Sequence, residues 1–297
     1  MIQPRKISLL IGLLLLSSSS FASEVSQHII HHISDAKNSI EKLENGNYCK
    51  TRKCVFITFW DFDGTILKGD CSEGFEENNQ AVYAGLAQRA IEAGLSKKYG
   101  KQDFQKFWNK YKQSEKKSHE SAYSFLTTAF EGTRYDDLVQ FSEGYFQSDL
   151  KKYIFKDSLE IINELKKQNI VIHVVSASPE YFVKGSASTG VTPKENIDGI
   201  QVRLNQGIVS NQVLAPITYA QGKVVRIKKI LTQMQKEQKT KAIFVLGGFG
   251  NSFPTDADFL EFIKNKSLPA GQPISTMING SGKKGRFEKM FFDVSFN

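Results

Sequence analysis

Two carboxylates separated by one residue stand directly after an apolar run, in the segment DFDGT at residues 61–65. Asp61 and Asp63 would repel each other unless a cation or a proton lay between them. A carboxylate can attack phosphorus and form an aspartyl phosphate, and a second carboxyl group can protonate a leaving alcohol and then activate water. The pair therefore indicates phosphoryl-transfer chemistry. The alternative is a strand-to-turn cap, because Asp and Gly are common turn residues.

A hydroxyl group follows a second apolar run, at Ser176 after residues 170–175. With the small residues Ala177 and Ser178 behind it, this hydroxyl can donate a hydrogen bond to a phosphoryl oxygen. We expect a helix to begin here, with Ser178 as its cap and Pro179 at its first position. Its N-terminus would add backbone donors for an anion. Taken alone, Ser176 could also be an ordinary turn residue.

Lys223 stands at the start of a basic helix that we predict over residues 222–236. The helix dipole disfavours a cation at this end, so neutralising a bound phosphoryl group would offset that cost. The alternative is a solvent-exposed lysine.

A glycine-rich segment, GGFGNS at residues 247–252, follows a third apolar run and leads to Asp256 and Asp258. Glycines let the backbone turn close to a ligand. Oxygen ligands in such a loop suit a hard cation such as Mg²⁺. The alternative is an acidic loop without a ligand.

The elements that must position these residues form an alternating pattern. Buried strands are predicted at residues 55–60, 170–175, 242–246 and 274–278, and helices at residues 158–168 and 222–236. The continuous apolarity of the first strand indicates a central strand covered on both faces. Strands that alternate with helices predict the α/β class, with a Rossmann-like parallel sheet and helices on both faces. Ligands of such sheets bind at the carboxyl ends of strands.

The segment between the first two strands has a helical pattern without strong β runs. Helices are expected at residues 79–94, 101–112, 121–130 and 135–150. We interpret residues 71–155 as a helical cap domain inserted into an α/β core of residues 55–70 and 156–297. Specificity would lie in this cap, where Arg89 and Arg134 are candidates for the pocket lining. A β-hairpin is expected at residues 200–213.

Residues 1–22 have the features of a secretory signal peptide. A basic start precedes the apolar run at residues 7–16, and Ser20 and Ala22 occupy the small-residue positions of a cleavage site. The alternative is an uncleaved membrane anchor. No later stretch is long and apolar enough to cross a membrane. We therefore expect an exported protein, periplasmic or secreted, with no stable membrane span after cleavage.

Residues 23–54 are expected to form an N-terminal helix, over residues 23–46, and a linker. His28 and His32 share a face of this helix, as metal ligands would. We favour incidental histidines on a packed helix, since no third ligand is obvious.

Three cysteines are present, and export favours disulfides. Cys49 and Cys54 flank an expected turn and form the favoured pair, although Cys71 could be free or could displace either partner. A zinc site is less favoured, because no fourth ligand pattern lies nearby.

Composition and charge indicate which class of partner the protein binds. The chain has 297 residues, of which 40% are hydrophobic and 24% charged, and a formal net charge of +8. A modest basic field helps to recruit anionic substrates such as phosphate esters. No zinc-finger spacing or RNA-binding signature is found, so a small phosphorylated substrate is preferred to nucleic acid. The oligomeric state is not predicted.

The four segments, in this order, resemble the motifs of the haloacid dehalogenase superfamily. DFDGT at residues 61–65 matches the first motif closely, and VVSAS, which contains Ser176, matches the second. Lys223 matches the third, in a context similar to that of phosphoserine-phosphatase-type members. In the fourth, Asn251 stands in the first acidic position and Asp256 in the second, with a spacing one residue longer than expected. The resemblance covers about residues 55–265.

The resemblance implies a Mg²⁺-dependent phosphatase. Asp61 would attack phosphorus and bind Mg²⁺, and Asp63 would be the general acid and base, with its backbone carbonyl on the metal. Asn251 and Asp256 would complete the metal site, directly or through water.

The phosphoryl oxygens would be held by Ser176, Lys223 and Thr65, and Asp70 would face the substrate. Family dehalogenases lack the second acid and family ATPases carry threonine there, so the aspartate at residue 63 favours hydrolysis of a small ester similar to phosphoserine or phosphorylcholine. The alternatives are a non-catalytic protein that binds a phosphate ligand, and a phosphotransferase.

Overall fold

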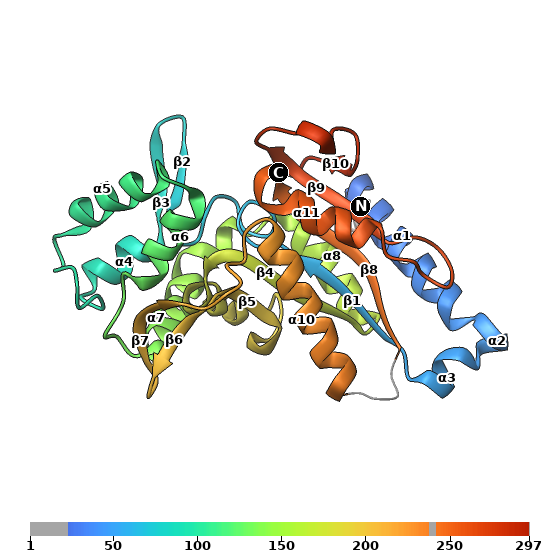
Figure 1. Ribbon diagram of the computed structural model, residues 1–297. Coiled ribbons are helices and arrows are strands. Elements are labelled where there is room, and N and C mark those ends of the chain that lie inside the picture. Colours follow the sequence, from blue (N-terminus) through green and yellow to red (C-terminus); the bar gives the residue numbers. More distant parts are fainter. Residues whose placement is uncertain (1–22, 238–241, 297) are drawn as a thin grey trace, which may run out of the picture.

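A six-stranded parallel sheet forms the centre of the computed structural model, which describes residues 23–237 and 242–296 (Figure 1). The strand order is β10-β9-β8-β1-β4-β5, and every neighbouring pair is parallel. The strands are β1 (Val55–Trp60), β4 (Ile170–Pro179), β5 (Ile197–Ile200), β8 (Ile243–Ser252), β9 (Ile274–Ser281) and β10 (Phe292–Val294). The predicted α/β fold class is confirmed.

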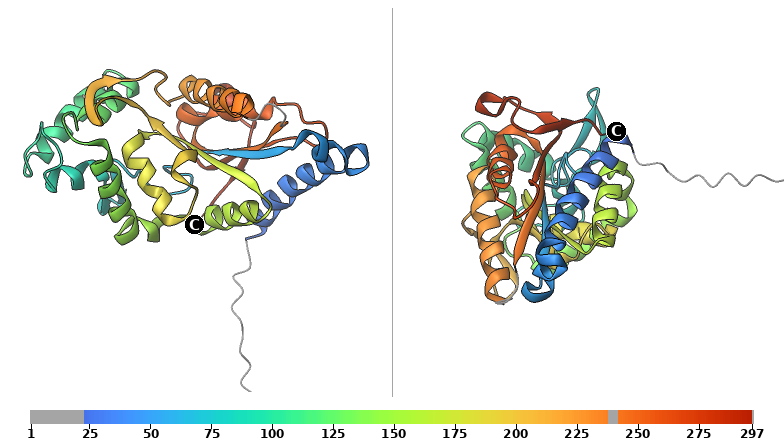
Figure 2. Two further views of the ribbon diagram at one scale, coloured as in Figure 1. Left: turned by 90° about the horizontal axis from the view of Figure 1, so that it is seen from below. Right: turned by 90° about the vertical axis from the view of Figure 1, so that its right-hand side faces the viewer.

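Helices cover both faces of the sheet. Helices α1 (Glu24–Glu41) and α8 (Lys156–Lys167) lie on one face, and α10 (Gln221–Glu237) and α11 (Phe253–Lys264) on the other (Figure 2). Successive side chains of a strand point to opposite faces. Trp60 therefore packs in the core layer that contains α1 and α8, whereas Phe59 packs in the layer that contains α10 and α11. This double burial explains why β1 is continuously apolar.

Two of the three strands that position the site are longer than their apolar runs. Strand β1 covers the predicted residues, but β4 and β8 continue through the polar segments that follow their apolar parts. Hydrogen bonding to a neighbour sustains this extension, because β4 still pairs with β5 at Pro179. The short strands β5 and β10 were not predicted, since three or four residues carry too little pattern.

The insert is largely helical, but it opens with a β-hairpin (Figure 1). Its elements are β2 (Gly74–Glu77), β3 (Gln80–Ala84), α4 (Leu86–Glu92), α5 (Phe104–Glu115), α6 (His119–Thr128) and α7 (Tyr135–Ser148). The helix predicted over residues 79–94 is thus wrong in its first part. Asn78 and Asn79 both have positive φ, 52° and 60°, and two such residues form the tight turn of a hairpin.

A second hairpin ties the core to the insert. Strands β6 (Val202–Asn205) and β7 (Ile208–Val213) confirm the hairpin predicted from the sequence. The backbone N–H of Gly132 donates to the carbonyl of Val209 at 2.9 Å, and the N–H of Val209 donates to the carbonyl of Thr133 at 2.9 Å. The insert is therefore held in place by this hairpin as well as by its two chain connections.

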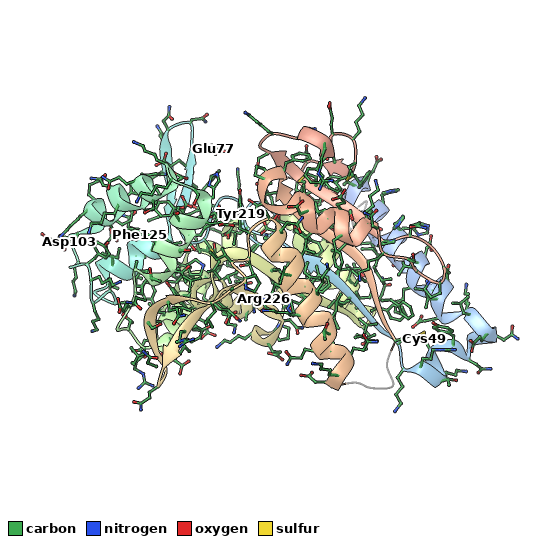
Figure 3. All side chains as sticks on the ribbon, in the orientation of Figure 1. Cys49, Glu77, Asp103, Phe125, Tyr219 and Arg226 are labelled. Atoms are coloured by element: carbon green, nitrogen blue, oxygen red, sulfur yellow. A yellow bond between two sulfur atoms is a disulfide. The ribbon has the colours of Figure 1, made fainter. Side chains whose placement is uncertain are left out.

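The N-terminal segment is less regular than predicted. Helix α1 ends at Glu41, and the short helices α2 (Leu43–Gly46) and α3 (Tyr48–Arg52) follow. Positive φ values at Glu44 and Asn45 interrupt the helix that was predicted to reach residue 46. Cys49 and Cys54 form a disulfide, as favoured, whereas Cys71 is buried and free. Cys49 lies at the opposite end of the molecule from Asp103 of the insert (Figure 3).

Four short 3₁₀ helices are present in the described part of the chain. The 3₁₀ helices are Leu150–Tyr153, Lys184–Thr189, Lys194–Asn196 and Gly285–Phe287. The signal peptide expected at residues 1–22 lies outside the described residues. Within the described part of the chain, no helix has the length and apolarity needed to cross a membrane. Of the two histidines weighed as metal ligands, His28 packs against the ring of Phe292, with 5.1 Å between the ring centroids, and His32 bonds to the carbonyl of Gln272 at 2.9 Å.

Candidate active site

A cleft of about 390 Å³ lies where the carboxyl ends of β1, β4 and β8 meet the insert. Its core side is lined by Asp61, Asp63, Gly64, Ala177, Ser178, Asn251, Ser252 and Thr255, and its insert side by Gly69, Asp70, Gly74, Phe75, Glu76 and Tyr123. Three of the four chemical segments recognised in the sequence thus open on one cavity. The fourth, which contains Lys223, lies directly beneath it.

Lys223 joins two buried carboxylates. Its Nζ donates to Asp61 Oδ1 at 2.5 Å and to Asp256 Oδ1 at 2.7 Å, and its side chain has no exposed surface. Burial and the charge of Asp256 raise the pKa of Asp61, the cation of Lys223 opposes both, and the resulting pKa is about 7. Burial lowers the pKa of Lys223, but the two carboxylates raise it, and the net shift is upward. The lysine therefore stays protonated and holds the Asp61 carboxylate.

The other oxygen of Asp61 is held by Thr65. The Thr65 hydroxyl donates to Asp61 Oδ2 at 2.9 Å, and the Thr65 side chain is fully buried. The backbone N–H of Asp61 donates to the carbonyl of Phe249 at 2.8 Å. Thr65, which the sequence suggested as a phosphate contact, thus orients the carboxylate of Asp61 in this structure.

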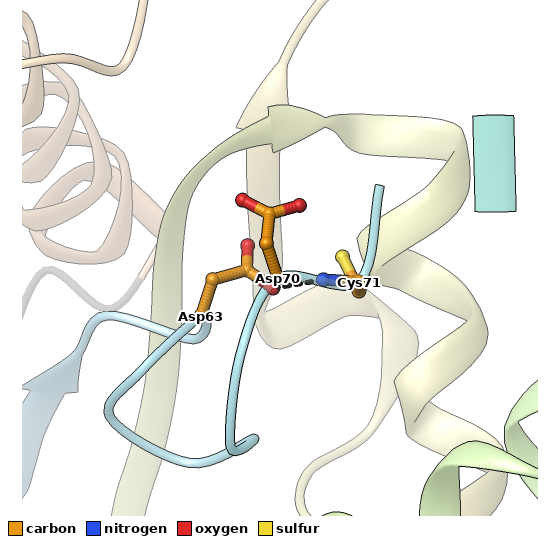
Figure 4. A group of neighbouring side chains, drawn as sticks. All are labelled: Asp63, Asp70 and Cys71. Carbon is orange, nitrogen blue, oxygen red and sulfur yellow. Dashed lines mark hydrogen bonds between the residues drawn. The ribbon is translucent and has the colours of Figure 1, made fainter. Parts of the chain in front are cut away.

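Asp63 receives hydrogen bonds on both carboxyl oxygens. The backbone N–H of Cys71 donates to Oδ1 at 2.7 Å (Figure 4), the hydroxyl of Ser178 donates to Oδ2 at 2.7 Å, and that of Ser176 donates to Oδ2 at 3.2 Å. Burial raises the pKa of Asp63 to about 7, with a further contribution from the charge of Asp70. A carboxyl group with a pKa near neutrality can give and take a proton under physiological conditions.

The position of Ser178 against Asp63 is the feature of the site that the sequence did not predict. We expected it to cap a helix, but it belongs to β4, and helix α9 (Glu180–Val183) begins after Pro179. The helix-start prediction is therefore wrong at this residue, because pairing with β5 keeps the backbone extended. Ser176 lies two residues earlier, and its hydroxyl accepts a hydrogen bond from the N–H of Ser178 at 3.0 Å.

Asp256 shapes the loop that carries Asn251. Its Oδ2 accepts hydrogen bonds from the backbone N–H groups of Asn251, at 2.9 Å, and Ser252, at 3.0 Å. With Lys223 on Oδ1, both oxygens of this fully buried carboxylate are bonded to the protein. Asn251 instead lines the cleft. Direct binding of a metal by Asp256 stays a prediction.

A close approach of two loops brings the expected metal ligands together. Gly64 has φ +75°, and a Cβ added there would lie 1.8 Å from Asn251 Nδ2. Only glycine lets the amide come this near to the segment that carries Asp61 and Asp63. The donors that face the cleft are carboxylate and amide oxygens, which are the ligands of a hard cation. The residues present therefore fit Mg²⁺.

Asp70 contributes a further carboxylate at the insert side of the cleft. Its Oδ1 accepts hydrogen bonds from the N–H groups of Ser72, at 2.7 Å, and Glu73, at 2.8 Å. Polar atoms of Asp63, Asp70 and Cys71 all lie within 4.8 Å of one another (Figure 4).

The arginines suggested for the pocket do not reach it. Arg89 pairs with Glu92 at 3.1 Å, and Arg134 pairs with Asp137 at 3.8 Å, so neither lines the cleft. Among the described residues, the insert side offers carboxylates and aromatic rings in their place.

Comparison with solved structures supports the fold. A protein of unknown function from Bordetella pertussis Tohama I is 12% identical, with a TM-score of 0.59 over 81% of this chain and 98% of its own. A conserved, functionally unknown protein from Anaerococcus prevotii DSM 20548 is 14% identical, with a TM-score of 0.55 over 89% and 93%. Cytosolic 5'-nucleotidase IIIB bound to cytidine is 16% identical, with a TM-score of 0.54 over 89% and 84%.

A comparison with curated proteins found no match. The family model described as haloacid dehalogenase-like hydrolase matches residues 58–252, which include the segments of Asp61, Ser176, Lys223 and Asn251. The match covers more than half of the chain and begins and ends within β1 and β8, the strands that carry the cleft. The chain therefore belongs to the haloacid dehalogenase-like hydrolase family.

Proposed function

We propose that this hydrolase is an exported, Mg²⁺-dependent phosphomonoesterase that acts through an aspartyl phosphate on Asp61. The observation that carries the proposal is the geometry around Asp61. Thr65 and Lys223 hold its two oxygens, and it shares one cleft with the second carboxyl group, that of Asp63. A fixed carboxylate next to a group of near-neutral pKa is the pairing that nucleophilic attack followed by proton transfer requires.

The proposed reaction has two steps, formation and hydrolysis of the aspartyl phosphate. The Asp61 carboxylate attacks phosphorus as the ester P–O bond breaks, and Asp63 gives its proton to the leaving alcohol. Asp63 then takes a proton from a water molecule that attacks phosphorus, which releases inorganic phosphate and restores both carboxyl groups. Lys223 keeps Asp61 oriented and supplies positive charge beneath the reacting group.

The metal ligands in this proposal are the Asp61 carboxylate, the backbone carbonyl of Asp63 and the amide oxygen of Asn251. Bound Mg²⁺ would offset the negative charge of the phosphoryl group and of the carboxylates that face it. Asn251 supplies an oxygen without charge, so we expect a weaker requirement for the metal than two acidic ligands would give.

The cleft favours an ester whose alcohol carries an amine. Among the described residues that line the cavity there is no lysine or arginine, whereas Asp70 and Glu76 place carboxylates at the insert side and Tyr123 places an aromatic ring there. Carboxylates and aromatic faces attract ammonium groups. We therefore propose substrates similar to phosphorylcholine or phosphoserine, with residues 71–155 acting as the cap that selects them. Phosphorylcholine fits this wall better, because the carboxylate of phosphoserine would meet no lysine or arginine among the residues that line the cleft.

Export is proposed on two grounds. The first is the signal-peptide pattern of residues 1–22. The second is the disulfide between Cys49 and Cys54, since such bonds persist mainly outside the cytosol. The proposed location is the periplasm or the extracellular medium.

The test is hydrolysis of p-nitrophenyl phosphate by the mature protein, with Mg²⁺ and with EDTA, beside Asp61→Asn. We expect turnover that needs the metal and is lost in the variant, while the thermal unfolding of the variant stays close to that of the wild type. Binding of phosphate without any turnover would favour the non-catalytic alternative. Transfer of the phosphoryl group to added alcohols in place of water would favour a phosphotransferase.

A further inference from the structure

We propose that Ser178 is the positioning residue for Asp63, and that its hydroxyl holds this carboxyl group where it can exchange a proton with the leaving alcohol. The inference rests on the proposed function. Ser178 lies 115 residues after Asp63 in the chain, yet its Oγ donates to Asp63 Oδ2 at 2.7 Å. The exposed fraction of Ser178 is 4%.

The contact completes a clamp on the carboxyl group. Oδ1 of Asp63 is fixed by the N–H of Cys71 at 2.7 Å, from the connection to the insert, and Oδ2 is fixed by Ser178, from the core strand β4. Ser176 adds a longer contact to Oδ2 at 3.2 Å. Two anchors on opposite oxygens allow one orientation of the carboxyl plane, whereas a single anchor would leave it free to rotate. Ser178 supplies the shorter of the two hydroxyl contacts to Oδ2.

A hydroxyl suits this place better than a backbone N–H would. The N–H group of Cys71 can only donate, but the hydroxyl of Ser178 can rotate to donate or to accept. It can therefore keep its contact with Oδ2 both before and after a proton leaves Asp63. The thiol of Cys71 lies 3.6 Å from Ser178 Oγ and can donate to it, which helps to fix the hydroxyl.

The extended backbone of β4 explains why Ser178 reaches Asp63 at all. A helix beginning at Ser178 would turn this side chain toward its own backbone N–H groups. Pairing of Pro179 with Ile200 of β5 keeps the segment extended instead. Ser176 and Ser178 lie where the register of β4 against β5 is irregular, between Val175 and Pro179, and both hydroxyls reach Oδ2 of Asp63.

A positioning role predicts a loss that depends on the leaving group. Phenol is a poor leaving group that needs a proton from Asp63, whereas p-nitrophenol leaves readily as an anion. Phenyl phosphate and p-nitrophenyl phosphate have nearly the same shape, so binding in the cleft is matched. For Ser178→Ala we expect kcat/KM, which reports attack on the ester and not the later hydrolysis of the aspartyl phosphate, to fall by about tenfold or more for phenyl phosphate. For p-nitrophenyl phosphate, kcat/KM should change by less than about twofold.

Two further variants make the experiment decisive. Ser178→Gly removes the hydroxyl without adding volume, and it should show the same selective loss even if the alanine variant folds poorly. Ser186→Ala removes a fully buried hydroxyl that has no hydrogen-bond partner among the described residues, and it should leave the ratio of the two kcat/KM values unchanged.

The outcomes separate the inference from the function on which it rests. Equal losses of kcat/KM with both esters in Ser178→Ala and Ser178→Gly, or no loss with either, would overturn the positioning role while the phosphatase stands. No turnover of either ester by the wild-type protein would overturn the proposed function, and this inference with it.

Discussion

Replacing Lys223 with methionine should destabilise the folded protein strongly. The lysine side chain has no exposed surface, and it bonds to two carboxylates that are themselves almost fully buried, those of Asp61 and Asp256. Methionine fills a similar volume, so the change removes charge more than packing. Two like charges are then left in the interior without a cation between them.

The magnitude follows from the burial of the three groups. Breaking a buried ion pair by removing one partner costs about 3–5 kcal/mol, and Lys223 serves two partners. Part of this cost is relieved when a carboxylate takes up a proton. The pKa of Asp61 is already raised to about 7 by burial and Asp256, against the opposing effect of Lys223. Losing Lys223 raises it further, so the folded variant binds more protons than the unfolded chain. Its stability therefore falls as pH rises, and the loss is larger above neutrality than in mild acid.

The assay is urea unfolding followed by circular dichroism, in EDTA so that metal binding does not contribute. Lys229→Met on the same helix is the matched control, because Lys229 is exposed, and it should change the free energy of unfolding by less than about 0.5 kcal/mol. The double variant Lys223→Met with Asp256→Asn should recover part of the loss. A single Lys223→Met variant as stable as the control at all pH values would refute the reasoning.

Three further predictions concern other parts of the molecule. Gly64→Ala should raise the Mg²⁺ concentration for half-maximal activity about tenfold or more, because the new Cβ would displace the amide of Asn251. The control is Gly144→Ala, where a Cβ meets nothing within 4 Å. An equal response of both variants would contradict this prediction. Glu76→Gln should raise KM for phosphorylcholine about two- to fivefold, the equivalent of about 0.5–1 kcal/mol, and leave KM for p-nitrophenyl phosphate unchanged; equal shifts would argue against an amine site. Cys49→Ser should lower the free energy of unfolding by about 2 kcal/mol, and reducing agent should lower the wild type to the same level but leave the variant unaffected.

The sequence alone predicted the parts of the fold and site that depend on short stretches of chain. The run VFITFW fixes β1 because each of its faces is buried by a separate helix layer. The prediction that Asp61 and Asp63 belong to the site follows from that strand, because ligands bind at the carboxyl ends of parallel strands. Lys223 was identified because a cation is unfavourable at the start of a helix, and its bonds to two buried carboxylates offset that cost.

What the sequence reading missed depends on contacts between distant segments. Ser178 bonds to a residue 115 positions away, and nothing in the local pattern distinguishes it from a helix cap. The position of Asp256 under Lys223 is of the same kind, with 33 residues between them. The hairpin β2–β3 was missed for a local reason, because the alanines of residues 79–94 resemble a helix face while the turn at Asn78 and Asn79 carries the deciding signal.

The most direct test of the central claim is to trap the intermediate. The mature protein would be mixed with p-nitrophenyl phosphate and Mg²⁺, quenched in acid during turnover, and treated with borohydride, which reduces an acyl phosphate to an alcohol. Peptide mapping by mass spectrometry should then find homoserine in place of Asp61, at an occupancy that falls when the ester is used up, and no such product in Asp61→Asn. Turnover with an unmodified Asp61, or with the modification on another carboxylate, would contradict the assignment of Asp61 as the nucleophile.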